Sequence, residues 1–278
     1  MSIFRQFLRG TILGLILSTG LLVVAAHVDL PLPPEPEPYV VTTLDDAIEA
    51  SIPVVCREKN TGRAFATGSA ARLYSPKNGK WLLATAAHVT AGCKHTEKMQ
   101  LVIEPDVDEN GNPGLRFEVK RTVLEGNLFA MYHGKEYKLK TRIENKDEDV
   151  SLVFTEKKIG GAYPYFLFNN KVPNYQQLVY AFGYPANYNF PKPVTVVTSG
   201  HINVPLVSFE QEKGPLLLFI VHDAKTWYGN SGGPMTDDNF KLMGLNVRLE
   251  ESGRGLATPV WYIQQHLKEI KYHEEIYN

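Results

Sequence analysis

Short apolar runs alternate with turn-forming residues through most of the chain, and this pattern predicts β-strands. Asn78-Gly79, between two such runs, is typical of a tight turn, and the polar stretch 106–114 is expected to be a loop. Because no long helices alternate with the strands, we expect an all-β barrel or sandwich. The expected strands are 52–56, 64–74, 81–84, 98–104, 115–123, 129–139, 150–154, 177–182, 194–198, 201–207, 216–221, 241–249 and 255–258.

Two short helices are expected near the ends of the folded region, which we place at 41–278. Thr43 is suited to cap a helix that continues to residue 50, because acidic residues occupy its first turn. Near the C-terminus, apolar residues at helical spacing predict a helix at about 259–271, with Thr258 as its cap and Pro259 in its first turn.

The first 28 residues have the composition of a targeting or anchoring segment. Arg5 and Arg9 precede a mostly apolar run at 11–26, which is shorter than the ~20 residues that span a bilayer unless it extends over 10–28. Val24-Ala25-Ala26 fits a cleavage site. Residues 1–28 are therefore expected to be either a cleaved signal peptide or a retained membrane anchor, and the proline-rich stretch 29–40 a semi-rigid linker.

Composition excludes several classes of function. The chain has 29 Lys and Arg against 30 Asp and Glu, so it lacks the basic excess of a nucleic-acid-binding protein. Its eight histidines have no close metal-ligand spacing, and it has only two cysteines, so we expect no metal site. If the chain is exported, Cys56 and Cys93 could form a disulfide. Two buried free thiols are an equally good interpretation of the sequence alone.

The most informative stretch is Gly229-Asn230-Ser231-Gly232-Gly233-Pro234. Glycines on both sides allow a sharp backbone turn that leaves the serine hydroxyl open to a ligand. A serine needs a neighbouring base to become a good nucleophile. His88 is the best-placed base, since it follows an apolar strand and small residues surround it.

A catalytic histidine also needs a carboxylate that orients its ring. Asp149 is the preferred residue, because an apolar strand starts directly after it. Asp147 and Glu148 are close rivals on spacing alone.

Together, Thr85-Ala86-Ala87-His88, Asp149-Val150-Ser151-Leu152-Val153 and the glycine-rich segment resemble the motifs of trypsin-like (chymotrypsin-fold) serine peptidases in order and spacing. Asp223-Ala224 and Gly255-Leu256-Ala257-Thr258-Pro259 are similar to the bacterial HtrA-like branch. The likeness covers roughly 47–267. It implies two packed six-stranded β-barrels, at about 50–165 and 175–260, with a C-terminal helix and an active site between the barrels.

The resemblance also implies residue roles. His88 would be the general base, Asp149 would orient it, and Ser231 would attack the substrate carbonyl. The backbone N–H groups of Gly229 and Ser231 would form the oxyanion hole. The implied function is a serine endopeptidase that acts on proteins or peptides without a cofactor, outside the cytoplasm, either periplasmic, secreted or membrane-anchored.

Several residues depart from the family pattern or bear on the substrate. Asn230 argues against activation by cleavage of a new N-terminus, and no PDZ-type domain is expected after residue 267. A small or apolar side chain is the expected cleavage preference, unless Lys225 and Arg248 favour an acidic one. The residues expected to contact substrate are Lys225, Trp227, Tyr228, Asn246 and Arg248.

Two other interpretations stay open at this stage. An α/β-hydrolase also uses a G-x-S-x-G turn, but it orders its triad as serine, acid and histidine, and few residues follow Ser231. A catalytically silent peptidase fold could serve as a binding or scaffolding module. The sequence leaves the oligomeric state and the natural substrate open.

Overall fold

The computed structural model describes residues 38–74, 79–107, 113–159, 161–185, 195–209 and 216–270. The predicted signal or anchor segment, most of the linker and most of the turn around Asn78 lie outside these ranges. In the part of the chain that the structure describes, no helix is both long and apolar enough to cross a membrane.

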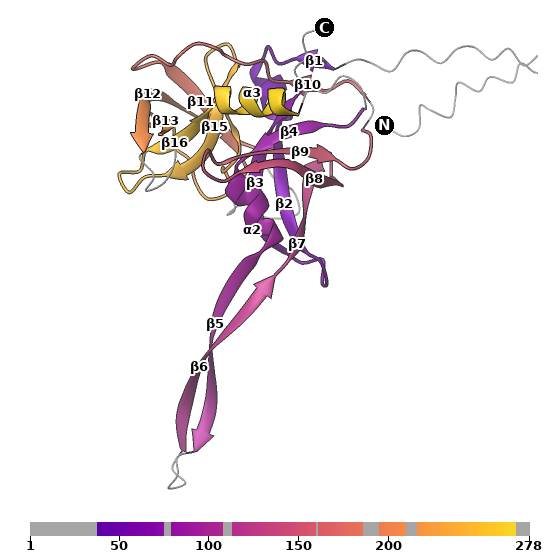
Figure 1. Cartoon of the computed structure of the whole chain (residues 1–278), viewed down its shortest axis with the longest axis vertical. Coiled ribbons are helices and arrows are strands. Elements are labelled where there is room, and N and C mark those ends of the chain that lie inside the picture. The colour runs from indigo at the N-terminus through magenta and orange to yellow at the C-terminus, as the bar shows by residue number, and fades with distance from the viewer. Residues whose placement is uncertain are drawn as a thin grey trace, which may run out of the picture. The chain divides into compact units, whose positions relative to one another are not determined.

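Two closed six-stranded barrels form the body of the domain, as predicted (Figure 1). The first barrel has the strand order β2-β3-β4-β9-β8-β7. Its strands β2, β4 and β9 are buried along most of their length, so they occur in the sequence as unbroken apolar runs. The bounds are β2 (Ser51–Glu58), β3 (Ala64–Leu73), β4 (Leu82–Thr85), β7 (Gly126–Tyr132), β8 (Lys135–Asn145) and β9 (Val150–Thr155).

The second barrel has the strand order β11-β12-β13-β16-β15-β14. A large apolar cluster draws residues from both barrels and from the terminal helix, including Leu152, Phe182 and Ile263, and so packs the two barrels together. The bounds are β11 (Leu178–Gly183), β12 (Val196–Phe209), β13 (Leu217–His222), β14 (Pro234–Thr236), β15 (Leu242–Leu249) and β16 (Gly255–Pro259). Outside the barrels, β1 (Tyr39–Val40) pairs in parallel with β10 (Pro164–Tyr165).

Two strand predictions were wrong in detail. The predicted strand 129–139 is two strands, β7 and β8, joined by a tight turn at His133 and Gly134, both with positive φ. Conversely, the predicted strands 194–198 and 201–207 are one strand, β12. Gly200 lies between the two predicted runs and allows close packing within β12, because a Cβ at this position would lie 2.2 Å from the backbone nitrogen of Ala224.

Three helices complete the described fold: α1 (Leu44–Ala50), α2 (Ala87–Lys94) and α3 (Val260–Glu269). Thr43 caps α1, as predicted, and forms a capping box with Asp46. Helix α2 was not predicted; it starts two residues after β4 and places His88 in its first turn. The predicted cap of α3 was wrong, because Pro259 occupies the N-cap position and the Thr258 hydroxyl bonds elsewhere.

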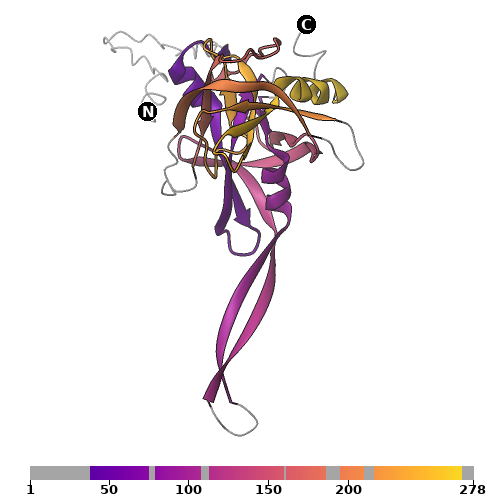
Figure 2. The same ribbon diagram turned by 90° about the vertical axis from the view of Figure 1, so that its left-hand side faces the viewer.

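Between α2 and β7, a long antiparallel hairpin extends away from the barrels in both views (Figures 1 and 2). It consists of β5 (Thr96–Val107) and β6 (Pro113–Leu124). The loop predicted at 106–114 is therefore shorter than expected, because β5 continues to Val107 and β6 begins at Pro113. A disulfide between Cys56 of β2 and Cys93 of α2 fixes the base of this hairpin to the first barrel.

Arg72 is a buried cation inside the first barrel. Its guanidinium donates to the backbone oxygens of Pro164 (3.3 Å) and Glu49 (3.1 Å), and it lies 3.9 Å from the centroid of the Trp81 ring. Burial lowers the pKa of Arg72 to about 10, so the group is still charged at neutral pH. Cation–π contacts with Trp81 and Tyr132 replace part of its lost hydration.

His222, at the end of β13, is fully buried, with the Asn246 side chain and the Ala224 backbone beside its ring. Burial lowers the pKa of His222 from 6.5 to about 4, although the Asp223 carboxylate acts in the opposite direction. Below pH 6.5 the unfolded chain therefore takes up a proton at His222 that the folded chain does not bind. This difference destabilises the fold as the pH falls, until the folded state is protonated near pH 4.

We predict that His222→Leu flattens the dependence of stability on pH. In the unmodified protein, His222 should lower the free energy of unfolding by ~3 kcal/mol between pH 7 and pH 4. Urea denaturation at several pH values measures this slope. His201→Leu is the control, because His201 is exposed on the neighbouring strand. Equal slopes in the unmodified protein and His222→Leu would contradict the prediction.

Candidate active site

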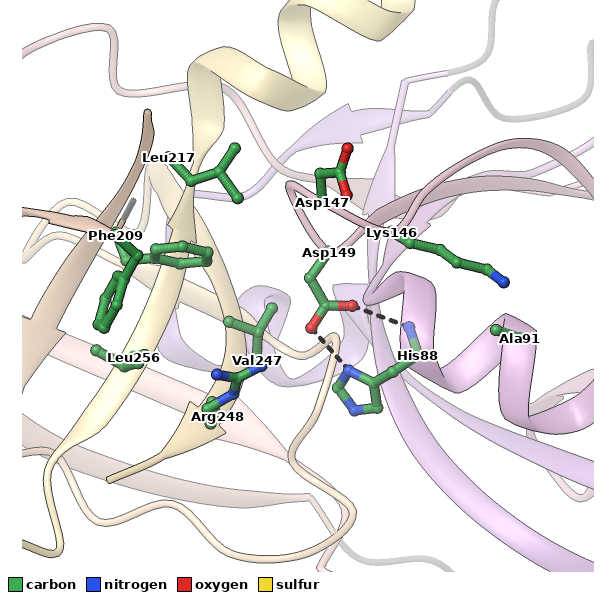
Figure 3. Close-up of a pocket in the computed structure, with 11 residues that line it drawn as sticks. His88, Ala91, Lys146, Asp147, Asp149, Phe209, Leu217, Val247, Arg248 and Leu256 are labelled. Atoms are coloured by element: carbon green, nitrogen blue, oxygen red, sulfur yellow. Dashed lines mark hydrogen bonds and ion pairs between the residues drawn. The ribbon is translucent and has the colours of Figure 1, made fainter. Parts of the chain in front are cut away.

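His88 and Asp149 meet through two hydrogen bonds (Figure 3). The Asp149 carboxylate accepts one from the His88 backbone N–H (2.9 Å) and another from Nδ1 of its ring (2.8 Å). This contact holds the ring with its proton on Nδ1, so Nε2 has a free lone pair. Asp149 is mostly buried, whereas about half of the His88 side chain is exposed. The pair therefore has the geometry of an oriented general base.

The backbone of Asp149 has a φ of 53°, a left-handed conformation that aspartate tolerates better than most residues. The tight turn between β8 and β9 imposes this conformation. Asn145 supports the turn by accepting hydrogen bonds from the backbone of Asp147 and Glu148. Asp147 does not bond to His88, so the structure favours Asp149 over the two rivals that the sequence left open.

The second barrel also holds this turn in place. Thr258 of β16 donates its hydroxyl to the backbone oxygen of Glu148 (2.8 Å). The Glu148 side chain bonds Nε2 of the buried His266 on α3 (2.5 Å), and Nδ1 of His266 contacts Glu269. Sequence reasoning missed the two contacts of Glu148, because they join residues more than 100 positions apart. Asp149 is therefore positioned by both barrels.

Ser231 lies in a compact loop that begins with a turn from Trp227 to Asn230. The Asn230 N–H donates to the Trp227 oxygen (3.0 Å), and Gly229 has a φ of 96°. Only glycine adopts this conformation readily at the third position of such a turn. Among the described residues, the N–H groups of Gly229 and Ser231 have no hydrogen-bond acceptor, so both are available to an oxyanion.

Ser69 of β3 connects the Ser231 loop to both barrels. Its N–H donates to the Ser231 oxygen (2.8 Å), and its hydroxyl donates to the Gly229 oxygen (2.8 Å). The same hydroxyl accepts from the backbone N–H of Tyr184 (3.0 Å), directly after β11. Its carbonyl accepts from the Thr85 hydroxyl (2.7 Å). The sequence showed only a small residue beside a glycine here, with no chemical sign of this role.

The Ser231 loop packs directly against the chain that leads into His88. A Cβ built on Gly232 would lie 2.1 Å from the Thr85 hydroxyl and 2.7 Å from the Ala86 nitrogen. Within the described residues, however, the Ser231 hydroxyl makes no hydrogen bond to His88. The structure thus pairs the acid with the base and brings the serine loop beside them, with the serine–histidine bond unformed.

A pocket of about 620 Å³ opens beside the His88–Asp149 pair, between the two barrels (Figure 3). Barrel one contributes charged residues around His88, whereas barrel two contributes an apolar wall and Arg248. The apolar wall was not predicted, since its residues read as ordinary strand positions in the sequence. The lining residues are His88, Ala91, Lys146, Asp147, Asp149, Phe209, Leu217, Phe219, Val247, Arg248 and Leu256.

The other residues expected to contact substrate lie outside this pocket lining. Trp227 and Tyr228 are exposed and stack edge to face on each other. Lys225 is exposed, and its carbonyl accepts from the Thr198 hydroxyl (2.8 Å). Asn246 is buried and donates to the oxygens of Gly233 and Pro234 (3.0 and 3.3 Å), so the structure gives it a supporting position behind the serine loop.

Asp223 anchors the segment before the loop. Its carboxylate accepts from the backbone N–H of His201 (2.6 Å) and from Asn203 (3.3 Å). The hydrogen bond from His201 is the main reason that the pKa of Asp223 is lowered. In the described residues, no group of histidine, cysteine and carboxylate side chains is arranged to hold a metal ion.

We predict that Ser69→Ala loosens the Ser231 loop. It leaves the Gly229 oxygen and the Tyr184 N–H without their partner, and an unsatisfied buried group costs ~1–3 kcal/mol. Urea denaturation should show a loss of this size. Ser208→Ala, at an exposed position of β12, should change stability by less than ~0.5 kcal/mol. Similar losses in the two variants would contradict this role.

We also predict that Asp149→Asn reverses the tautomer of His88. The asparagine amide would donate to Nδ1, so the proton would move to Nε2 and the free lone pair would be lost there. The ¹⁵N chemical shifts of the His88 ring report this change. Asp147→Asn, in the same pocket, should leave them unaltered. An unchanged tautomer in Asp149→Asn would show that other contacts orient the ring.

Comparison with known proteins agrees with this geometry. Among curated proteins, no sequence matches this chain. A family model described as a trypsin-like peptidase domain matches residues 66–245. This match covers more than half of the chain, including the His88 segment, the Asp149 turn and the Ser231 loop. Together with the two closed barrels, it shows that the chain belongs to the trypsin-like peptidase domain family.

Proposed function

We propose that the protein is a serine endopeptidase in which Ser231, His88 and Asp149 form the catalytic triad. The observation that carries this proposal is the double contact of the Asp149 carboxylate with His88, which leaves Nε2 free on the exposed side of the ring. By contrast, both ring nitrogens of the buried His266 contact carboxylates.

The reaction begins as the Ser231 oxygen attacks the scissile carbonyl carbon and its proton passes to His88 Nε2. Asp149 stabilises the resulting imidazolium. The N–H groups of Gly229 and Ser231 donate to the developing oxyanion, and a donor of this kind is worth ~10²–10³ in turnover. His88 then protonates the departing amine as the C–N bond breaks, which leaves an acyl-enzyme.

Water then hydrolyses the acyl-enzyme, again with His88 as the general base. His88 removes a proton from the water as its oxygen attacks the acyl carbon. The second tetrahedral intermediate collapses and returns the proton to the Ser231 oxygen. No group beyond these residues is required for either half-reaction.

The pocket beside His88 supports a preference for apolar substrate side chains. Phe209, Leu217 and Phe219 line it from barrel two, and their surface would be buried against an apolar residue of the substrate. Arg248 at the same pocket offers a place for a substrate carboxylate. Cleavage of a peptide library would separate an apolar from an acidic preference.

The unformed bond between Ser231 and His88 favours one alternative, a silent peptidase fold that serves as a binding or scaffolding module. Catalytic hydrogen bonds are often loose without substrate and tighten when it binds. The unpartnered N–H groups of Gly229 and Ser231 support catalysis over the silent module, because a scaffold has no need of them.

We also propose that the domain works outside the cytoplasm. The Cys56–Cys93 disulfide is typical of oxidising compartments, and residues 1–28 have the composition of a signal or anchor. Membership of the HtrA-like branch stays a prediction from sequence motifs.

Labelling with an active-site fluorophosphonate tests the proposal. We predict covalent modification of the unmodified protein, none of Ser231→Ala, and a loss of at least ~10³-fold in labelling rate for His88→Ala, because the serine then lacks its base. Ser252→Ala is the control, since Ser252 is exposed in the turn between β15 and β16, is not among the residues that line the pocket, and should label normally. If the unmodified protein stays unlabelled while a folded state is verified by circular dichroism, the silent module is favoured.

A further inference from the structure

The β5–β6 hairpin exposes a large apolar surface. Five of its aliphatic side chains, those of Met99, Leu101, Ile103, Val119 and Val123, are between 51% and 66% exposed. In both views the hairpin extends beyond the barrels (Figures 1 and 2). None of these residues lines the pocket beside His88, so their exposure has no explanation in the proposed active site.

The strand register places these five side chains on one face. Leu101 pairs with Val119, and Met99 and Ile103 are two residues to either side of Leu101. Residues that pair across strands share a face, and so do residues two apart along a strand. Val123 joins the same face through its pairing with Glu97. We call this set the arm face.

The hairpin also has two unpaired edges, because β5 and β6 pair only with each other in the described part of the chain. Isolated two-stranded hairpins are marginally stable in water, and long exposed edges invite pairing with another chain. A partner that covers the arm face would therefore stabilise the hairpin.

A bilayer is a poor partner for this hairpin. Open strand edges do not occur in the hydrocarbon region of a membrane, because their N–H and C=O groups would stay unpaired there. The arm face is also flanked by charges, since Arg121 pairs with Met99 and Glu97 pairs with Val123. A protein surface can accommodate both features.

We propose that the arm face binds the arm face of a second copy of this chain. Five half-exposed aliphatic side chains leave on the order of 500 Å² of apolar surface, as much as the largest patch on a typical monomer. Two copies would bury on the order of 1,000 Å², which reaches the lower limit for a specific interface. The aliphatic side chains of one arm face can pack against the same side chains of a second copy, as a two-fold interface requires.

The base of the hairpin presents the arm face in a fixed position. The Cys56–Cys93 disulfide holds the end of α2, and Thr96, the first residue of β5, bonds back to the Gly92 oxygen. Ordering the arm before association reduces the entropy lost on binding.

Cysteine cross-linking of the full chain in intact cells tests the proposal. The only two cysteines of the chain are bonded to each other, so Leu101→Cys adds a single free thiol at the centre of the arm face. We expect a short bis-maleimide to convert Leu101→Cys into a covalent dimer. Gln100→Cys is the matched control on the opposite face, and it should give at least tenfold less dimer.

A second substitution tests whether the face itself drives association. Adding Val119→Glu to Leu101→Cys should abolish the cross-link, because it places a charge in the interface, whereas Thr122→Glu on the opposite face should not. Thermal melts of both variants confirm that the barrels stay folded. Equal dimer from Gln100→Cys and Leu101→Cys, or none from either, would overturn the proposal. Shielding of Leu101→Cys from an impermeant maleimide without a dimer would assign the arm face to a different partner and also overturn it.

Discussion

The hydrogen bonds of Ser69 hold together the parts on which the candidate site depends. This buried residue of barrel one bonds the Ser231 loop through its N–H and its hydroxyl, and barrel two through Tyr184. Apolar packing between the barrels supplies more free energy, but it is not directional. Directional bonds in a buried environment fix the loop to a particular place, since each unmade bond would leave a polar group unsatisfied. The position of Ser231 is thus a property of the barrel interface.

The turn that carries Asp149 is held by the reverse arrangement. Asp149 belongs to barrel one, yet the turn that carries it is bonded by Thr258 and His266 from barrel two and its helix. Each barrel therefore helps to position a residue of the candidate site that belongs to the other. Separation of the barrels would disturb Ser231 and Asp149 together, which couples the stability of the domain to the geometry of the candidate site.

The fold class and the His88–Asp149 pairing could be predicted because they depend on local signals. Unbroken apolar runs marked buried strands, and Asp149 stood out because such a run follows it. The interpretation failed where long-range packing decides. The strands predicted at 194–198 and 201–207 are one strand, in which Gly200 packs against the backbone of Ala224. The hydrogen bonds of Ser69 and the wall of Phe209 and Leu217 depend on residues brought together only by barrel closure, which no local pattern encodes.

Helix α2 both carries His88 and supports the β5–β6 hairpin. Its first turn carries His88, whose ring must stay in register with Asp149, while its last residue leads into the long β5–β6 hairpin. Because the hairpin is long, a force on its outer end is transmitted to α2. The Cys56–Cys93 disulfide joins the end of α2 to β2, so a force on the arm is passed to barrel one before it reaches the first turn. One short helix can therefore both carry the oriented His88 ring and support the exposed β5–β6 hairpin.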